Sequence, residues 1–316
     1  MHQTQAYLPY GFYQPQQAAA KQQPPVSEDM RRMFQYLEGL YKPETRENSI
    51  LELAKDRESY HHLGPALWYG VGIMSVLLQE IISVYPLLST PHLLAKGMAN
   101  RVSSVLTLLQ AVAFHESTRR MFLDSQMCLF LYPFLRGMNE GTEGLRLTSL
   151  GVIGALVKTD DHDVVQYLLN TEIFPLCLNI MESGTEFSKT LATFIVQRLL
   201  NSEGGLKYVC LTPERFTAVA TVLGKLVESK DCSTRLLRYI IRCYLRLSEN
   251  QRGREALSRC LPQALRNATY KQALESNTGL VRNLLQLLVN IGDAGATKLH
   301  ESLLAGGKPQ GGDASA

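Results

Sequence analysis

Apolar residues recur at helical spacing through the middle of the chain, with short polar interruptions between the runs. In the segment 145–201, Leu147, Leu150, Ile153 and Val157 follow steps of three and four residues, which places them on one face of a helix. Three further apolar runs follow: 164–169, 173–180 and 191–199. The segment therefore predicts four consecutive helices and contains no strand pattern.

This layout repeats along the chain. Comparable long helices are expected from Val105, Leu150, Leu191 and Leu236, which are 45, 41 and 45 residues apart. Each is followed by a polar turn, a short helix and a third helix. Repeats of this length are typical of armadillo and HEAT solenoids, in which each unit covers the exposed apolar face of its neighbour. With a unit before Pro86 and a C-terminal cap from Leu280 to Ile291, the pattern predicts an all-α armadillo-like superhelix of about six repeats.

The two ends of the chain differ from the repeats. Residues 1–27 are rich in Gln, Pro and Tyr, and residues 305–316 are rich in Gly, so we expect both to be disordered tails around a repeat domain at 28–292. The N-terminal segment is interpreted as a plain tail or as an adhesive segment that favours condensates. Inside the domain, one long helix is expected from Pro65 to Tyr85. Its apolar stripe is broad, which indicates either deep burial or a docking surface.

Composition and motifs argue against catalysis. The 32 basic and 29 acidic residues nearly balance, no apolar run is long enough to span a membrane, and the start lacks a secretory signal pattern, so an intracellular protein is expected. The six cysteines have no metal or disulfide spacing and are interpreted as reduced thiols. Catalytic motifs and metal-ligand sets are missing, so neither enzyme activity nor a cofactor is predicted. The acidic turn of Asp160, Asp161 and Asp163 is interpreted as a helix N-cap.

The segment 233–250 carries a stripe of arginines on one face of a predicted helix, namely Arg235, Arg238, Arg242 and Arg246. Between residues 232 and 260 there are seven arginines against two glutamates, a net charge of +5. The stripe is either an ordinary solvated face or, if it lines the concave side of the superhelix, a site for phosphates or an acidic peptide. Few aromatic residues lie nearby, so single-stranded nucleic acid would bind there with little sequence specificity.

Small residues mark a second candidate surface. Gly151 and Gly154 lie with Leu191 on the expected row of first helices. They either leave a groove that a partner helix enters or allow two helices to pack closely. The sequence alone does not choose between these two interpretations.

Several uncommon strings, in order, resemble a known family. These are PETREN (43–48), LLQEI (77–81), LFLYPFL (129–135), RLTSLGVIGALVKTD (146–160), IMESG (180–184), SKTLATFI (188–195) and RCYLRLS (242–248). Over residues 28–290 the chain resembles the "required for cell differentiation" family, the armadillo-repeat subunit of the Ccr-Not deadenylase complex. The resemblance implies six armadillo repeats and a non-catalytic adaptor in mRNA deadenylation, decay and translational repression.

The resemblance also implies particular site residues. The family's scaffold-docking positions fall on Tyr69, Val71, Ser75 and Ile82, and its peptide groove falls on Gly151 and Leu191, beside Gly144 where the family has tyrosine. Its tryptophan-accepting pockets correspond to Pro213, Arg215, Arg252 and Ala256. Pro213 replaces a family aromatic, which removes a stacking contact worth about 1 kcal/mol and argues against tryptophan capture. The family's basic groove retains Arg235, Arg242 and Arg246.

Partners and location follow from the same resemblance. It implies binding to the Not scaffold subunit and to short peptides of RNA-binding regulators, with no membrane contact. It leaves open single-stranded nucleic acid as a further partner and a homodimer in the absence of the scaffold. A cytoplasmic location that includes P-bodies is expected, with a nuclear pool left open.

Overall fold

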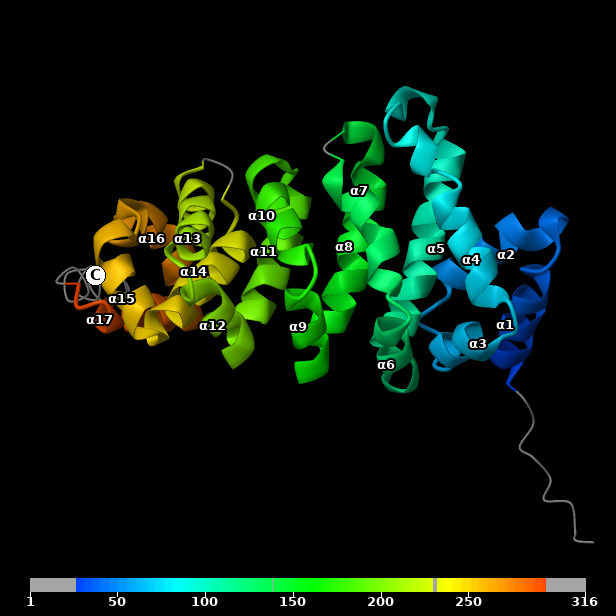
Figure 1. Cartoon of the computed structure of the whole chain (residues 1–316), viewed down its shortest axis with the longest axis horizontal. Helices are drawn as coiled ribbons and strands as arrows, with labels where there is room; N and C mark the ends of the chain where they lie inside the picture. The colour runs from blue at the N-terminus through cyan, green and yellow to red at the C-terminus, as the bar shows by residue number, and fades with distance from the viewer. Residues whose placement is uncertain (1–26, 138, 230–231, 294–316) are drawn as a thin grey trace, which may run out of the picture.

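The computed structural model describes residues 27–137, 139–229 and 232–293, and within these ranges the chain forms helices and turns with no strand. The helices stack side by side into one elongated array, with α1 near one end and α17 near the other (Figure 1). Both predicted tails, 1–27 and 305–316, fall outside the described residues except for Ser27.

The repeats consist of three successive helices, as the sequence predicts. The first helices are α5 (Lys96–Phe114), α8 (Glu143–Val157), α11 (Glu186–Asn201) and α14 (Thr234–Glu249), and each packs against the next. The second helices are α6 (Glu116–Asp124), α9 (His162–Leu169), α12 (Glu203–Cys210) and α15 (Gln251–Cys260). The third helices are α7 (Tyr132–Arg136), α10 (Ile173–Ser183), α13 (Pro213–Glu228) and α16 (Lys271–Glu275).

The ends of the array complete this row of first helices. At one end α1 (Glu28–Gly39) packs on α2 (Pro43–Lys55), and α2 packs on α5. At the other end α17 (Thr278–Asn290) packs on α14. Short 3-10 turns connect several helices: Tyr85–Leu87, Pro91–Leu93, Met127–Leu131, Glu140–Thr142, Gln263–Leu265 and Ala268–Tyr270.

The prediction of one long helix from Pro65 to Tyr85 is wrong. The segment forms two helices, α3 (Leu63–Tyr69) and α4 (Ile73–Ile82), and the segments Leu63–Tyr69 and Ile73–Leu87 meet at 91°. Gly72 makes this corner because its φ of 77° lies in the left-handed region, which side chains disfavour. The apolar stripe looked broad because two helices with different buried faces contribute to it.

One continuous core runs through the array. The first helices bury most of their apolar residues, including Leu106, Leu150, Ile195 and Leu237. Asp161 caps α9 by accepting from the backbone N–H of Asp163, which confirms the N-cap interpretation at that position.

The thiols belong to this core or its edges. All six cysteines are free, and burial raises the pKa of Cys128 and of Cys177 to about 12, which keeps both protonated and unreactive.

In the described part of the chain, no single helix combines the length and apolarity of a bilayer span. Two sharply bent helix pairs, α3 with α4 and α9 with α10, meet the length and composition test only when joined.

Candidate binding surfaces

The corner between α3 and α4 exposes an apolar surface, here called the corner surface, formed by Tyr69, Val71, Ser75 and Ile82. Val71 is 88% exposed and Tyr69 is 62% exposed, and Ser75 and Ile82 are also exposed. Ser75 and Ile82 are seven residues apart on α4, about two helical turns, which places them on one face of this helix, whereas Val71 lies in the corner that precedes it. All four predicted scaffold-docking residues are therefore accessible to a partner.

The corner surface is held in place from both sides. The Tyr41 hydroxyl donates a hydrogen bond of 2.8 Å to the carbonyl oxygen of Val71, while Ile73 and Leu77 anchor α4 in the core. The Tyr69 hydroxyl lies 3.9 Å from the Met121 sulfur on α6. An exposed apolar surface on a fixed backbone loses little entropy when it is covered by a partner.

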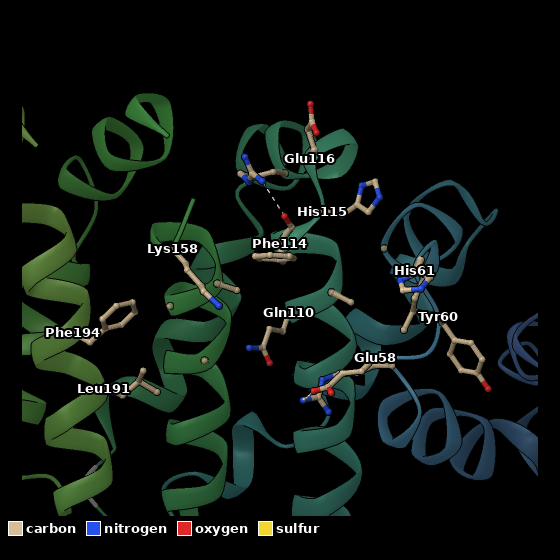
Figure 2. A pocket seen from close by; sticks show the side chains of 18 of the residues that line it. Glu58, Tyr60, His61, Gln110, Phe114, His115, Glu116, Lys158, Leu191 and Phe194 are labelled. Carbon is tan, nitrogen blue, oxygen red and sulfur yellow. Dashed lines mark hydrogen bonds and ion pairs between the residues drawn. The ribbon is translucent and has the colours of Figure 1, made fainter. Parts of the chain in front are cut away.

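A second surface is a groove of about 1120 Å³ across α5, α8 and α11, here called the central groove. It brings together the two residues predicted for peptide binding, Gly151 and Leu191, and it also includes Arg235 and Tyr239 from α14. Figure 2 shows Leu191 and Phe194 on one side of the open space, with Gln110 and Phe114 facing it from α5. The loop 57–61 and Leu63 form its far end.

Two glycines of α8, Gly151 and Gly154, line the central groove. A Cβ added to Gly151 would approach only the side-chain amide of Gln110, at 3.9 Å. A Cβ on Gly154 would meet Leu191 at 3.7 Å and Phe194 at 3.8 Å, which is ordinary van der Waals contact. This spacing favours the groove interpretation over tight helix packing.

Gly151→Ala is therefore expected to raise the free energy of unfolding by about 0.5–1 kcal/mol, because alanine stabilises a helix interior relative to glycine. Chemical denaturation of the purified variant measures the change. A loss of stability would instead favour the close-packing interpretation.

Cationic side chains outnumber acidic ones along the central groove. Arg57, Arg119, Lys158 and Arg235 line it, against Glu58 and Glu116. Two of these arginines already form ion pairs: Arg57 with Glu58 at 3.2 Å, and Arg119 with Asp161 at 3.6 Å. The Lys158 ammonium lies 5.9 Å from the Phe114 ring centroid, a cation–π contact that leaves its charge available to a ligand.

The structure separates the predicted arginine stripe into three environments. Arg235 lines the central groove, whereas Arg238 and Arg242 line a smaller hollow together with Arg282 of α17. The prediction that Arg246 belongs to an open basic groove is wrong. Its guanidinium pairs with Glu203 and Glu249 and donates to the Leu200 carbonyl oxygen at 3.2 Å. Its role is to join α14 to the preceding repeat rather than to form part of an open basic surface.

The residues predicted for tryptophan pockets lie at the start of α13 and on α15. Pro213 occupies the first turn of α13, and the Arg215 guanidinium stacks 4.0 Å from the Tyr208 ring centroid. The end of α12 adjoins the start of α15, since a Cβ on Gly253 would lie 3.5 Å from the Cys210 sulfur. Arg252 is exposed and Ala256 is half-buried on that helix. Arg215 is thus already engaged with Tyr208.

Several surface residues escaped the sequence prediction. Phe114, Lys158 and Phe194 line the central groove, and Arg282 completes the smaller hollow. Phe194 could have been found from its position three residues after Leu191, which is one helical turn. Arg282 gave no such signal, because only tertiary structure brings it near α14. Among the described residues no cluster of three or more potential metal ligands occurs.

The architecture defines an armadillo-repeat protein. A designed armadillo-repeat protein in complex with the peptide (KR)4 superposes with a TM-score of 0.53 at 12% identity, covering 81% of this chain and 98% of that chain. A second, computationally designed armadillo-repeat protein gives 0.53 at 11% identity, covering 82% and 98%. These similarities confirm the predicted fold class.

The family follows from sequence comparison. The model of the cell differentiation family, Rcd1-like, matches residues 36–291. The chain is 50% identical over 265 residues to cell differentiation protein rcd1 of Schizosaccharomyces pombe, covering 83% of this chain and 93% of that protein. It is 48% identical over 258 residues to protein CAF40 of Saccharomyces cerevisiae, covering 80% and 69%. The chain belongs to the Rcd1-like cell differentiation family.

Proposed function

We propose that this chain is a non-catalytic adaptor subunit of the Ccr-Not complex in mRNA deadenylation, decay and translational repression. Family membership and the armadillo-repeat fold support this assignment. The observation that carries it is the corner surface, where Val71 is 88% exposed on a backbone fixed by Tyr41. An exposed apolar surface on rigid helices is suited to a protein partner, and the Not scaffold subunit is the partner assigned to it.

The central groove is assigned to short peptides of RNA-binding regulators. Leu191, Phe114 and Phe194 provide apolar and aromatic anchor points along its floor and walls. A few such anchors usually carry most of the affinity of a peptide complex. An amphipathic helix whose apolar face meets these residues fits this arrangement.

Affinity purification of the full chain from cells, followed by mass spectrometry, tests the adaptor function. Recovery of the Not scaffold together with poly(A)-shortening enzymes is the expected result. The purified chain alone should leave polyadenylated RNA unshortened. A purification that repeatedly lacks the deadenylation machinery would rule out the assignment.

Single-stranded nucleic acid is a second candidate ligand. Arg238 and Arg242 form no ion pair with other described residues, so their charge is available to phosphates. The double variant Arg238→Glu/Arg242→Glu is expected to abolish binding of a single-stranded oligonucleotide, and wild-type binding should weaken steeply with salt. Fluorescence anisotropy at two salt concentrations measures both effects. Binding that survives the charge reversal would leave only the adaptor function.

The same proposal includes location and assembly. An adaptor of mRNA decay is expected in the cytoplasm, including P-bodies, with a nuclear pool as a further location. Self-association is expected only when the scaffold leaves an apolar surface uncovered.

A further inference from the structure

A hollow of about 310 Å³ between α14 and α17, here called the arginine hollow, lies outside the corner surface and the central groove. Arg238 and Arg242 line it from α14, and Arg282 lines it from α17. Asn277 and Asn283 contribute side chains that can donate hydrogen bonds. The hollow therefore collects guanidinium and amide donors from two helices that are adjacent only in the folded array.

The charge of the arginine hollow is not neutralised by the described part of the chain. None of the described residues that line it is acidic, and its three arginines form no ion pair with described residues. Elsewhere in the array, arginines at repeat junctions pair with carboxylates, as Arg246 does with Glu203 and Arg266 does with Asp293. Three like charges around one hollow repel one another unless an anion joins them.

The start of α17 adds to this positive potential. Asn277 is the N-cap of this 13-residue helix, and its side chain accepts from the backbone N–H of Leu280. The first turn of a helix carries partial positive charge, and here no acidic residue occupies it. The three arginines supply most of the positive charge at the hollow, and the helix end adds to it.

We propose that the arginine hollow binds the phosphate group of a phosphorylated serine or threonine in a partner peptide. A phosphomonoester carries nearly two negative charges and three acceptor oxygens, which match several guanidinium forks. A nucleic-acid strand fits less well, because its binding sites combine a continuous basic track with aromatic stacking. Among the described residues, no aromatic side chain lines the hollow.

The position of the hollow links it to the proposed peptide function, on which this inference rests. Arg235 lines the central groove, and Arg238, one helical turn further along α14, lines the arginine hollow. A peptide that leaves the groove across α14 can therefore place a phosphorylated side chain in the hollow. Phosphorylation of a regulator would then strengthen its binding to the adaptor.

The test uses the full chain and N-acetyl-O-phosphoserine amide as the probe, with N-acetylserine amide as its unphosphorylated counterpart. Calorimetric titration should show saturable binding of the phosphorylated probe only. Arg282→Gln is expected to weaken this binding at least about tenfold, because it removes a charge-assisted contact. The matched control Arg259→Gln, which removes an exposed arginine on α15, should leave binding unchanged.

Three results would overturn the inference: no saturable binding of the phosphorylated probe, equal weakening by both variants, or an Arg282→Gln effect confined to a single-stranded oligonucleotide. The last result would assign the hollow to nucleic acid. Arg282→Gln should leave co-purification of the scaffold intact. The two proposals can therefore fail separately. A wild-type purification that lacks the deadenylation machinery would refute the adaptor function, regardless of whether the phosphorylated probe binds.

Discussion

Val71→Asp combined with Ser75→Tyr is expected to abolish co-purification of the Not scaffold. Both positions are exposed on the corner surface, so the two changes should shift the free energy of unfolding by no more than about 0.5 kcal/mol. At the interface, however, the aspartate would bury an unpaired charge and the tyrosine would prevent close approach. We expect affinity to fall at least about a hundredfold, which corresponds to roughly 2.7 kcal/mol.

The matched control is Val289→Asp. Val289 is an exposed valine, 63% accessible, on α17 at the opposite end of the array. The Val289→Asp substitution introduces the same charge on a different surface, so recovery of the scaffold should match that of the wild type. Undiminished recovery with the Val71→Asp/Ser75→Tyr variant, whose fold is verified by circular dichroism, would remove the corner surface as the docking site.

Glu143→Ala should produce the largest loss of stability among the polar positions considered. The Glu143 carboxylate pairs with Arg146, whose side chain is only 3% exposed, and it accepts hydrogen bonds from Thr185 and Ser188 at the start of α11. Burial already lowers the pKa of Arg146, which reflects the cost of keeping this guanidinium away from water. Removing the carboxylate of a buried pair costs about 3–5 kcal/mol.

Chemical denaturation measures this change, with Glu140→Ala as the control. Glu140 is an exposed acid three residues earlier and forms no ion pair with described residues, so its loss should cost no more than about 0.5 kcal/mol. The double variant Glu143→Ala/Arg146→Met should recover much of the stability, because an apolar replacement removes the buried charge as well. Equal stabilities for Glu143→Ala and Glu140→Ala would show that the Glu143 carboxylate neither compensates the buried Arg146 charge nor holds α8 to α11 through Thr185 and Ser188.

The helical repeat could be predicted because it depends on local periodicity. Leu150, Ile153 and Val157 follow helical spacing, and comparable faces recur 41 to 45 residues apart, so the row α5, α8, α11 and α14 was foreseen from spacing alone. The break between α3 and α4 was missed for the same reason. Apolar residues continue at helical spacing through Leu67, Val71 and Met74, although Gly72 turns the backbone by its positive φ.

The candidate sites were predicted in part. Gly151 and Leu191 do line one groove, and the four corner residues are all exposed. The arginine stripe was less predictable, because the charge available on a helix depends on acids from other helices. Glu203 of α12 neutralises Arg246, whereas Arg282 of α17 reinforces Arg238 and Arg242.

By itself the sequence determined that this protein is a stack of helical repeats, since helix spacing and repeat length are written in the order of apolar and polar residues. Its uncommon strings also determined the family. Only the tertiary structure decided which surfaces are open. Exposure and net charge depend on residues more than 40 positions apart, such as Glu203 and Arg246, which packing brings within ion-pair distance.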